Sequence, residues 1–170
     1  MKTTNESTLS SEHPKITIGI GEMAIAKDNG ELVTYALGSC VSAILYSDKY
    51  RVGAMLHIAL PDSKIDPDKS KDLPGYFADT AIEALVNKIK NIGLQVKDCK
   101  ITLVGGAKVL SHEHTFDIGK RNYLSCKKAL WKYNLRVHRE DCGGEISRTA
   151  RLDIDTGIIT LQNGDRKWVV

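Results

Sequence analysis

The chain has 170 residues, of which 42% are hydrophobic and 26% are charged, and its formal net charge is +3. These values lie near the averages for soluble globular proteins and indicate one folded domain. Because basic and acidic residues are mixed along the chain, no continuous positive stripe indicates a nucleic-acid-binding protein. No apolar run approaches the roughly 18 residues of a membrane span, so we expect a cytoplasmic protein.

The first segment, residues 1–15, is polar and rich in Ser and Thr. It has few apolar side chains to bury, so we expect a flexible N-terminal tail and a single domain over residues 16–170. Short strand-like segments follow at 16–26, 32–37, 41–47 and 52–60. The front half of the chain is therefore predicted to be rich in strands.

The stretch from Pro61 to Pro74 holds three prolines and many charges, which predicts a surface loop after the preceding strand. A helix is predicted over residues 77–92. Its apolar residues recur at helical spacing: Phe77, Ala78, Ala81, Ile82, Leu85, Ile89 and Ile92. Gly93 is placed to end this helix in the left-handed conformation.

The second half contains a strand at 100–104 that ends in Gly105-Gly106, and a helix is predicted from about Gly119 to Tyr133. A turn is expected at 141–144. Further strands are predicted at 135–138, 146–154, 158–162 and 166–170. Two helices among eight or nine strands favour a layered α+β domain over a doubly wound one.

The four cysteines, Cys40, Cys99, Cys126 and Cys142, are widely spaced and form no CxxC pair. This spacing argues against a zinc ribbon and against a thioredoxin-type redox motif. Cys99 and Cys126 lie beside or within apolar-periodic runs, so we interpret them as small buried hydrophobic residues. Cys40 differs from these two, because it precedes a strand that is predicted to pair with the strand of His57.

Residues 37–47 and 52–57 are predicted to form a β-hairpin. If Ser47 pairs with Val52, Ser42 lies opposite His57, and Cys40 becomes its diagonal neighbour. The separation of 17 residues between Cys40 and His57 is odd, so a register that pairs odd with even positions places both side chains on one face. Their separation is then about 4.5 to 8 Å.

This proximity indicates a nucleophile and its base, because an adjacent imidazole can hold Cys40 as a reactive thiolate. Gly38 and Ser39 permit a tight turn that aims backbone N–H groups at one point, as in an oxyanion hole. Thr34 offers a hydroxyl that can accept from an N–H of His57. On the residues alone, the alternative is that Cys40 and His57 are ordinary core residues.

Three other motifs have structural interpretations. His112 and His114 form an HxH pair, which a solvated loop explains better than a metal site. The stretch 105–108 follows a strand but lacks the P-loop spacing, so it predicts a strand-to-loop turn. At the start of the second helix, Arg121 and Asn122 are expected to make structural hydrogen bonds, with substrate contact as the alternative.

The chain resembles the chemotaxis deamidase family CheD over residues 18–161. Five motifs carry the resemblance, in order: LGSCVSAILYS, GAMLHIALPDS, VGGAKV, IGKRN and EDCGGEISRTARLDIDTG. The resemblance implies that Cys40 is the nucleophile, His57 its histidine and Thr34 the supporting threonine. It also implies a layered α/β/β sandwich of mixed, mainly antiparallel strands, related to deamidating toxins. Val52 stands where many relatives have a second glycine before the histidine segment.

The resemblance implies hydrolysis of glutamine side chains on methyl-accepting chemotaxis receptors, in some members also methylesterase activity, with no metal or organic cofactor. It implies action at membrane-anchored receptor arrays and binding to a CheC-type phosphatase, for which the segment 61–74 is a candidate surface. One alternative is a regulatory module that binds CheC with little or no catalysis. A cysteine peptidase is a weaker alternative, because papain-like enzymes separate Cys and His by roughly 130 residues.

Overall fold

The computed structural model of the chain describes residues 13–108 and 117–170. Its strands are β1 (Lys15–Thr17), β2 (Met23–Lys27), β3 (Glu31–Leu37), β4 (Val41–Ser47), β5 (Val52–Ile58), β6 (Lys100–Gly105), β7 (Arg139–Cys142), β8 (Arg148–Asp153), β9 (Ile159–Asn163) and β10 (Arg166–Val169). Its helices are α1 (Pro67–Asp72), α2 (Ala78–Asn91) and α3 (Ile118–Lys132). Within these residues, no helix has both the length and the apolar character needed to cross a membrane.

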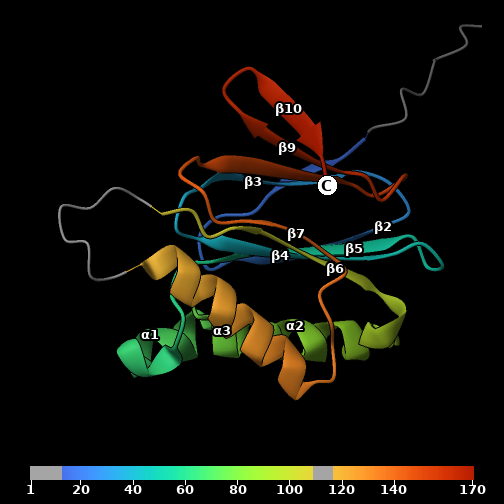
Figure 1. Cartoon of the computed structure of the whole chain (residues 1–170). Helices are drawn as coiled ribbons and strands as arrows, with labels where there is room; N and C mark the ends of the chain where they lie inside the picture. The colour runs from blue at the N-terminus through green and yellow to red at the C-terminus, as the bar shows by residue number, and fades with distance from the viewer. Residues whose placement is uncertain (1–12, 109–116) are drawn as a thin grey trace, which may run out of the picture.

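The strands form two sheets that pack face to face, and the helices lie below one of them (Figure 1). One sheet has the order β1-β3-β8-β9-β10, and the other has the order β2-β5-β4-β6-β7. One core lies between α2, α3 and the second sheet, and another lies between the two sheets. The predicted α+β class and the α/β/β layers are therefore confirmed.

The strand β4 lies at the centre of the helix-covered sheet, and all seven of its residues are buried. Val41, Ala43 and Leu45 join the core beneath the helices. Ile44 and Tyr46 join the core between the sheets. Because side chains alternate along a strand, Ser42 also faces the space between the sheets.

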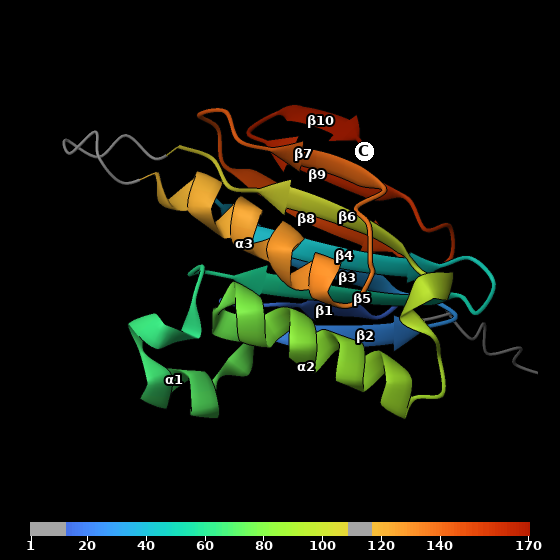
Figure 2. The same ribbon diagram turned by 60° about the horizontal axis from the view of Figure 1, so that its bottom comes forward.

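Both predicted long helices are confirmed, as α2 and α3, and each packs its apolar face on the sheet. Figure 2 shows the two helices side by side across that sheet. Gly93 follows α2 with φ +82°, a left-handed conformation that glycine adopts without a steric cost, so the predicted glycine stop is confirmed.

The segment 16–26, predicted as one strand-like run, is divided between the two sheets. β1 pairs with β3 in one sheet, and β2 pairs with β5 in the other. The cause is the intervening turn, where Gly21 has φ +79° and donates its N–H to the carbonyl of His57 at 2.7 Å. The break therefore brings the end of β1 and the start of β2 beside the candidate site.

The segment from Pro61 to Pro74 lies largely at the surface, as predicted, and it also contains helical turns that were not predicted. Asp66 caps the short helix α1 by accepting from the N–H of Lys69 at 3.0 Å, and Pro67 occupies the first turn. Proline is favoured at that position because its fixed φ suits a helix and its missing N–H is not needed there.

The strand predicted at 135–138 was misplaced. The strand in this part of the chain is β7, which pairs in parallel with β6 from Arg139 onward. Leu135 and Val137 instead pack against the helix-side core, which accounts for their apolar alternation. The turn expected at 141–144 is shorter than predicted, because its first two residues belong to β7.

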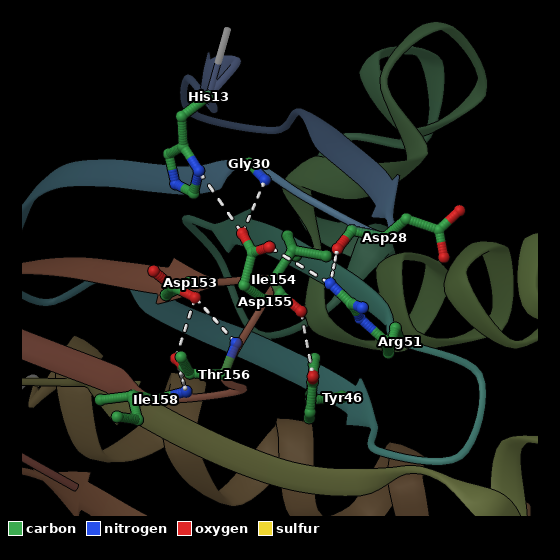
Figure 3. A network of polar contacts seen from close by, with 10 residues as sticks. All are labelled: His13, Asp28, Gly30, Tyr46, Arg51, Asp153, Ile154, Asp155, Thr156 and Ile158. Carbon is green, nitrogen blue, oxygen red and sulfur yellow. Dashed lines mark hydrogen bonds and ion pairs between the residues drawn. The ribbon is translucent and has the colours of Figure 1, made fainter. Parts of the chain in front are cut away.

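A polar network joins the two sheets at the hairpin end of β4, remote from Cys40 (Figure 3). The carboxylate of Asp155 lies 3.2 Å from Arg51 and 3.4 Å from His13, and it accepts from the N–H of Gly30. The hydroxyl of Tyr46 donates to the carbonyl of Ile154 at 3.0 Å. These contacts hold the β8–β9 turn against the β4–β5 hairpin.

Candidate active site

The hairpin β4–β5 has the predicted register. Ser47 pairs with Val52, and Ser42 pairs with His57. Cys40 comes two residues before Ser42 and packs against the core between the sheets. Cys40 and His57 are thus diagonal neighbours on the face that looks toward the other sheet, a relation that typically separates Cα atoms by about 7–8 Å.

Thr34, on β3 of the opposite sheet, supports His57 as predicted. Its Oγ1 lies 2.7 Å from Nδ1 of His57 and 2.8 Å from the carbonyl oxygen of Ile18. The hydroxyl has a single proton, and the carbonyl of Ile18 can only accept, so Thr34 donates to Ile18 and accepts from Nδ1–H of His57. This arrangement selects the tautomer whose Nε2 carries a free lone pair.

His57 is placed to act as a base. Its side chain is 3% exposed, and its Nε2 has no hydrogen-bond partner among the described residues. Burial lowers the pKa of His57 below the usual range, because the charged imidazolium loses its hydration. The imidazole is therefore neutral near pH 7, with Nε2 able to take a proton.

Cys40 is half-buried, and burial raises the pKa of its thiol, although its own backbone N–H partly offsets this effect. No hydrogen bond joins Cys40 to His57 within the described part of the chain. The raised pKa of Cys40 and the lowered pKa of His57 favour a neutral thiol and a neutral imidazole, so a thiolate can form only when a base removes the thiol proton. This differs from the pre-formed thiolate that the sequence suggested.

The other cysteines are poorer nucleophiles. Burial raises the pKa of Cys99 to about 11 and that of Cys142 to about 12. Cys126 is completely buried in α3, and burial raises its pKa further still. Among the four thiols, Cys40 therefore loses its proton most easily.

The turn before Cys40 is held by backbone hydrogen bonds. The N–H of Gly38 donates to Ala36 at 2.8 Å, and the carbonyl of Gly38 accepts from Ala107. The N–H of Gly38 is therefore already used, whereas the N–H groups of Ser39 and Cys40 donate to no other backbone group among the described residues. Gly38 contributes to the turn through its shape and its carbonyl.

Gly105 and Gly106 have a role at the site that sequence reasoning missed. The N–H of Gly106 donates to the carbonyl of Cys40 at 2.7 Å. At Gly105, which has φ +108°, an added Cβ would lie 2.3 Å from that same carbonyl oxygen. The glycine pair at the end of β6 therefore lets the backbone approach the Cys40 turn closely. From the sequence, these glycines predicted only a turn.

Asn122, in the first turns of α3, joins the two halves of the site. Its Nδ2 donates to the carbonyl of Ser39 and to the carbonyl of Ala59, both at 2.9 Å, and the residue is fully buried. Ser39 precedes Cys40, and Ala59 lies two residues after His57. The predicted structural hydrogen bonds of Asn122 are thus confirmed, and they fix the Cys40 turn relative to the His57 strand.

Other predicted features lie away from this site. His112 and His114 fall outside the described residues. Within residues 13–108 and 117–170, the side chains with ligand atoms close enough for a metal are His13, Asp153 and Asp155. They belong to the network at the opposite end of the sandwich (Figure 3), where Arg51 already pairs with Asp155.

Known proteins are similar to this chain over most of its length. The family described as "CheD chemotactic sensory transduction" matches residues 59–163. The chain is 38% identical to the "Probable chemoreceptor glutamine deamidase CheD" of Syntrophotalea carbinolica, over 91% of this chain and 98% of that protein. It is 39% identical to the "Chemoreceptor glutamine deamidase CheD" of Thermotoga maritima, over 87% of this chain and 91% of that protein. The chain therefore belongs to the CheD family.

Proposed function

We propose that this protein deamidates glutamine side chains of chemoreceptors, with Cys40 as nucleophile and His57 as its base. The observation that carries the proposal is the 2.7 Å hydrogen bond that Nδ1–H of His57 donates to Thr34. It leaves Nε2 without a partner among the described residues, on the face shared with Cys40. The names of the curated relatives, which are chemoreceptor glutamine deamidases, supply the substrate class.

In the first half of the reaction, Nε2 of His57 takes the thiol proton while Sγ of Cys40 attacks the carboxamide carbon. The negative oxygen of the tetrahedral intermediate accepts hydrogen bonds from the N–H groups of Ser39 and Cys40. The proton held by His57 then passes to the amide nitrogen, the C–N bond breaks and ammonia leaves. The product of this half is a thioester on Cys40.

In the second half, His57 removes a proton from water, whose oxygen attacks the thioester carbon. The C–S bond breaks, the sulfur takes the proton back from His57, and glutamate is released. Thr34 keeps the ring in one tautomer throughout, because Nδ1–H donates to its hydroxyl. None of these steps needs a metal or an organic cofactor.

The same centre accounts for methylesterase activity, because a glutamate methyl ester presents the same carbonyl with methanol as the leaving group. We also propose that a CheC-type phosphatase binds near this centre. The exposed segment 61–74 supports that location, because it follows β5 and is anchored where the N–H groups of Ala59 and Leu60 donate to Tyr76.

The test of the proposed function uses purified protein and the cytoplasmic fragment of a chemoreceptor. We expect ammonia release, with mass spectrometry locating the change from amide to acid at particular glutamines. If the protein binds a CheC-type phosphatase but releases no ammonia, it is a regulatory module and not an enzyme.

Replacement of Thr34 by Val should lower kcat about 10- to 100-fold, as for other groups that orient a histidine. Valine matches the shape of threonine but cannot accept from Nδ1–H of His57, so the ring is no longer held in the productive tautomer. Steady-state ammonia release measures the effect. Thr34→Ser, which keeps the hydroxyl, is expected to recover most of the rate, and equal loss in both variants would contradict the orienting role.

Replacement of Asn122 by Ala should lower kcat about tenfold or more with a smaller change in KM, because the Cys40 turn is no longer fixed against the His57 strand. The buried carbonyl of Ala59 and the part-buried carbonyl of Ser39 also lose their donor, and the buried one alone costs about 1–3 kcal/mol of folding stability. Thermal unfolding measures that cost. Asn91→Ala, an exposed substitution at the end of α2, is the control and should leave kcat and stability unchanged.

A further inference from the structure

Two adjoining hollows lie at the C-terminal ends of α2 and α3. One has a volume of about 730 Å³ and is formed by the last turns of α3 and the segment 135–140. The other has a volume of about 490 Å³ and lies between the ends of the two helices. Leu135 lines both, so we treat them as one surface and call it the C-terminal groove.

The lining of the C-terminal groove is strongly basic. Its ionised side chains are Lys90, Lys97, Lys127, Lys128, Arg136, Arg139 and Glu140. Six positive charges and one negative charge give the groove a formal charge of +5, so the rest of the chain, whose total is +3, carries −2. The positive charge of the protein is therefore concentrated on this one surface, which favours a negatively charged partner.

Apolar side chains also line the groove. Trp131 is 77% exposed, and it lies in the groove with Leu135, Val137 and Leu94. An exposed tryptophan beside basic side chains is typical of an interface, because its large ring gives much contact area at a small cost in conformational entropy. Apolar side chains of a partner would therefore contact these residues while its acidic groups pair with the basic side chains.

The groove and the candidate active site lie along the same helix. Asn122, near the start of α3, contacts the residue before Cys40. Trp131 lies nine residues further along α3, which corresponds to about 14 Å. Cys40 and His57 line neither hollow. One segment of a protein substrate can therefore contact the groove while a glutamine elsewhere on the same protein reaches Cys40.

We propose that the C-terminal groove binds an acidic, amphipathic helix of the chemoreceptor substrate and so selects which protein is deamidated. The inference rests on the proposed function. A glutamine carboxamide is the same in every protein, so contacts away from the reacting group have to distinguish the substrate. A groove between helix ends fits a helix, whereas an anionic membrane would favour a convex basic surface over two hollows.

The test compares Lys128→Glu/Arg136→Glu with a control that carries the same charge change elsewhere, Lys27→Glu/Lys167→Glu. All four residues are exposed, and none forms an ion pair in the described structure. With a receptor cytoplasmic fragment at low salt, the groove variant should raise KM about tenfold or more without changing kcat. The control variant and the wild type should have the same KM.

A glutamine peptide of three residues provides the second measurement, because it extends to only about 10 Å, less than the roughly 14 Å along α3 from Asn122 to Trp131. Both variants and the wild type should deamidate the peptide at the same rate. Trp131→Ala should also raise KM for the receptor fragment, and added salt should weaken binding of the wild type more than that of the groove variant.

Failure of this inference differs from failure of the proposed function. If the wild type deamidates the fragment and the groove variant has the same KM, the groove does not select the substrate. A groove variant that loses binding to phosphatidylserine vesicles but keeps its KM would assign the groove to a membrane surface. The proposed function would be overturned if the wild type deamidates neither the fragment nor the peptide. Binding to the inactive Cys40→Ala variant tests the groove separately: if the groove substitutions leave its affinity for the fragment unchanged, the inference is overturned.

Discussion

Replacement of Cys40 by Ala should lower ammonia release from a receptor fragment by about 10,000-fold or more, as expected when a nucleophile is removed. The physical reason is that no other described thiol lies on the face shared with Nε2 of His57, so no thioester can form there. Mass spectrometry of the receptor fragment should then find its glutamines unchanged.

The matched control is Cys142→Ala, which removes another half-buried cysteine. Burial raises the pKa of Cys142 to about 12, so this variant should keep full activity. In the wild type, alkylation by iodoacetamide should reach Cys40 before Cys99, Cys126 or Cys142. If Cys40→Ala keeps full activity, Cys40 is not the nucleophile.

Replacement of His57 by Gln should lower kcat by a similar factor, about 10,000-fold, because the thiol of Cys40 loses the group that takes its proton. The residual rate should rise with pH above the ordinary cysteine pKa of about 8.5, because burial raises the pKa of Cys40 and the thiolate then forms without a base. The pH profile of ammonia release measures both effects.

In the wild type, kcat/KM should rise with pH as His57 loses its proton and then level off. Burial lowers the pKa of His57, so this rise should be centred below the ordinary histidine value of about 6.5. The rise should be absent from the profile of His57→Gln. A wild-type profile that falls between pH 5 and pH 7 would mean that the protonated imidazole is the active form, contrary to the proposed base.

Much of the site was predictable because hairpin geometry is local. The odd separation of Cys40 and His57 places them on one face in any register that pairs odd with even positions, and the observed pairing of Ser42 with His57 has that parity. The two long helices were predictable for the same reason, since their apolar periodicity is carried by consecutive residues.

Contacts between distant parts of the chain were harder to predict. The motif around Gly105 and Gly106 indicated a turn, but its hydrogen bonds to the Cys40 turn depend on how β6 lies beside β4. The misplaced strand at 135–138 has a similar cause, because an alternating apolar pattern can pack against helices as well as in a sheet.

The sequence by itself determined that Cys40 and His57 share one face of the hairpin, the α+β class and the resemblance to the CheD family. The tertiary structure decided the tautomer of His57, because Thr34 reaches Nδ1 from the other sheet and donates to the carbonyl of Ile18. It also decided the protonation of the resting pair, since burial sets both pKa values and depends on every layer of the fold. Periodicity depends on neighbouring residues and can be recognised in the sequence. Desolvation and contacts between sheets depend on residues that lie far apart in the chain.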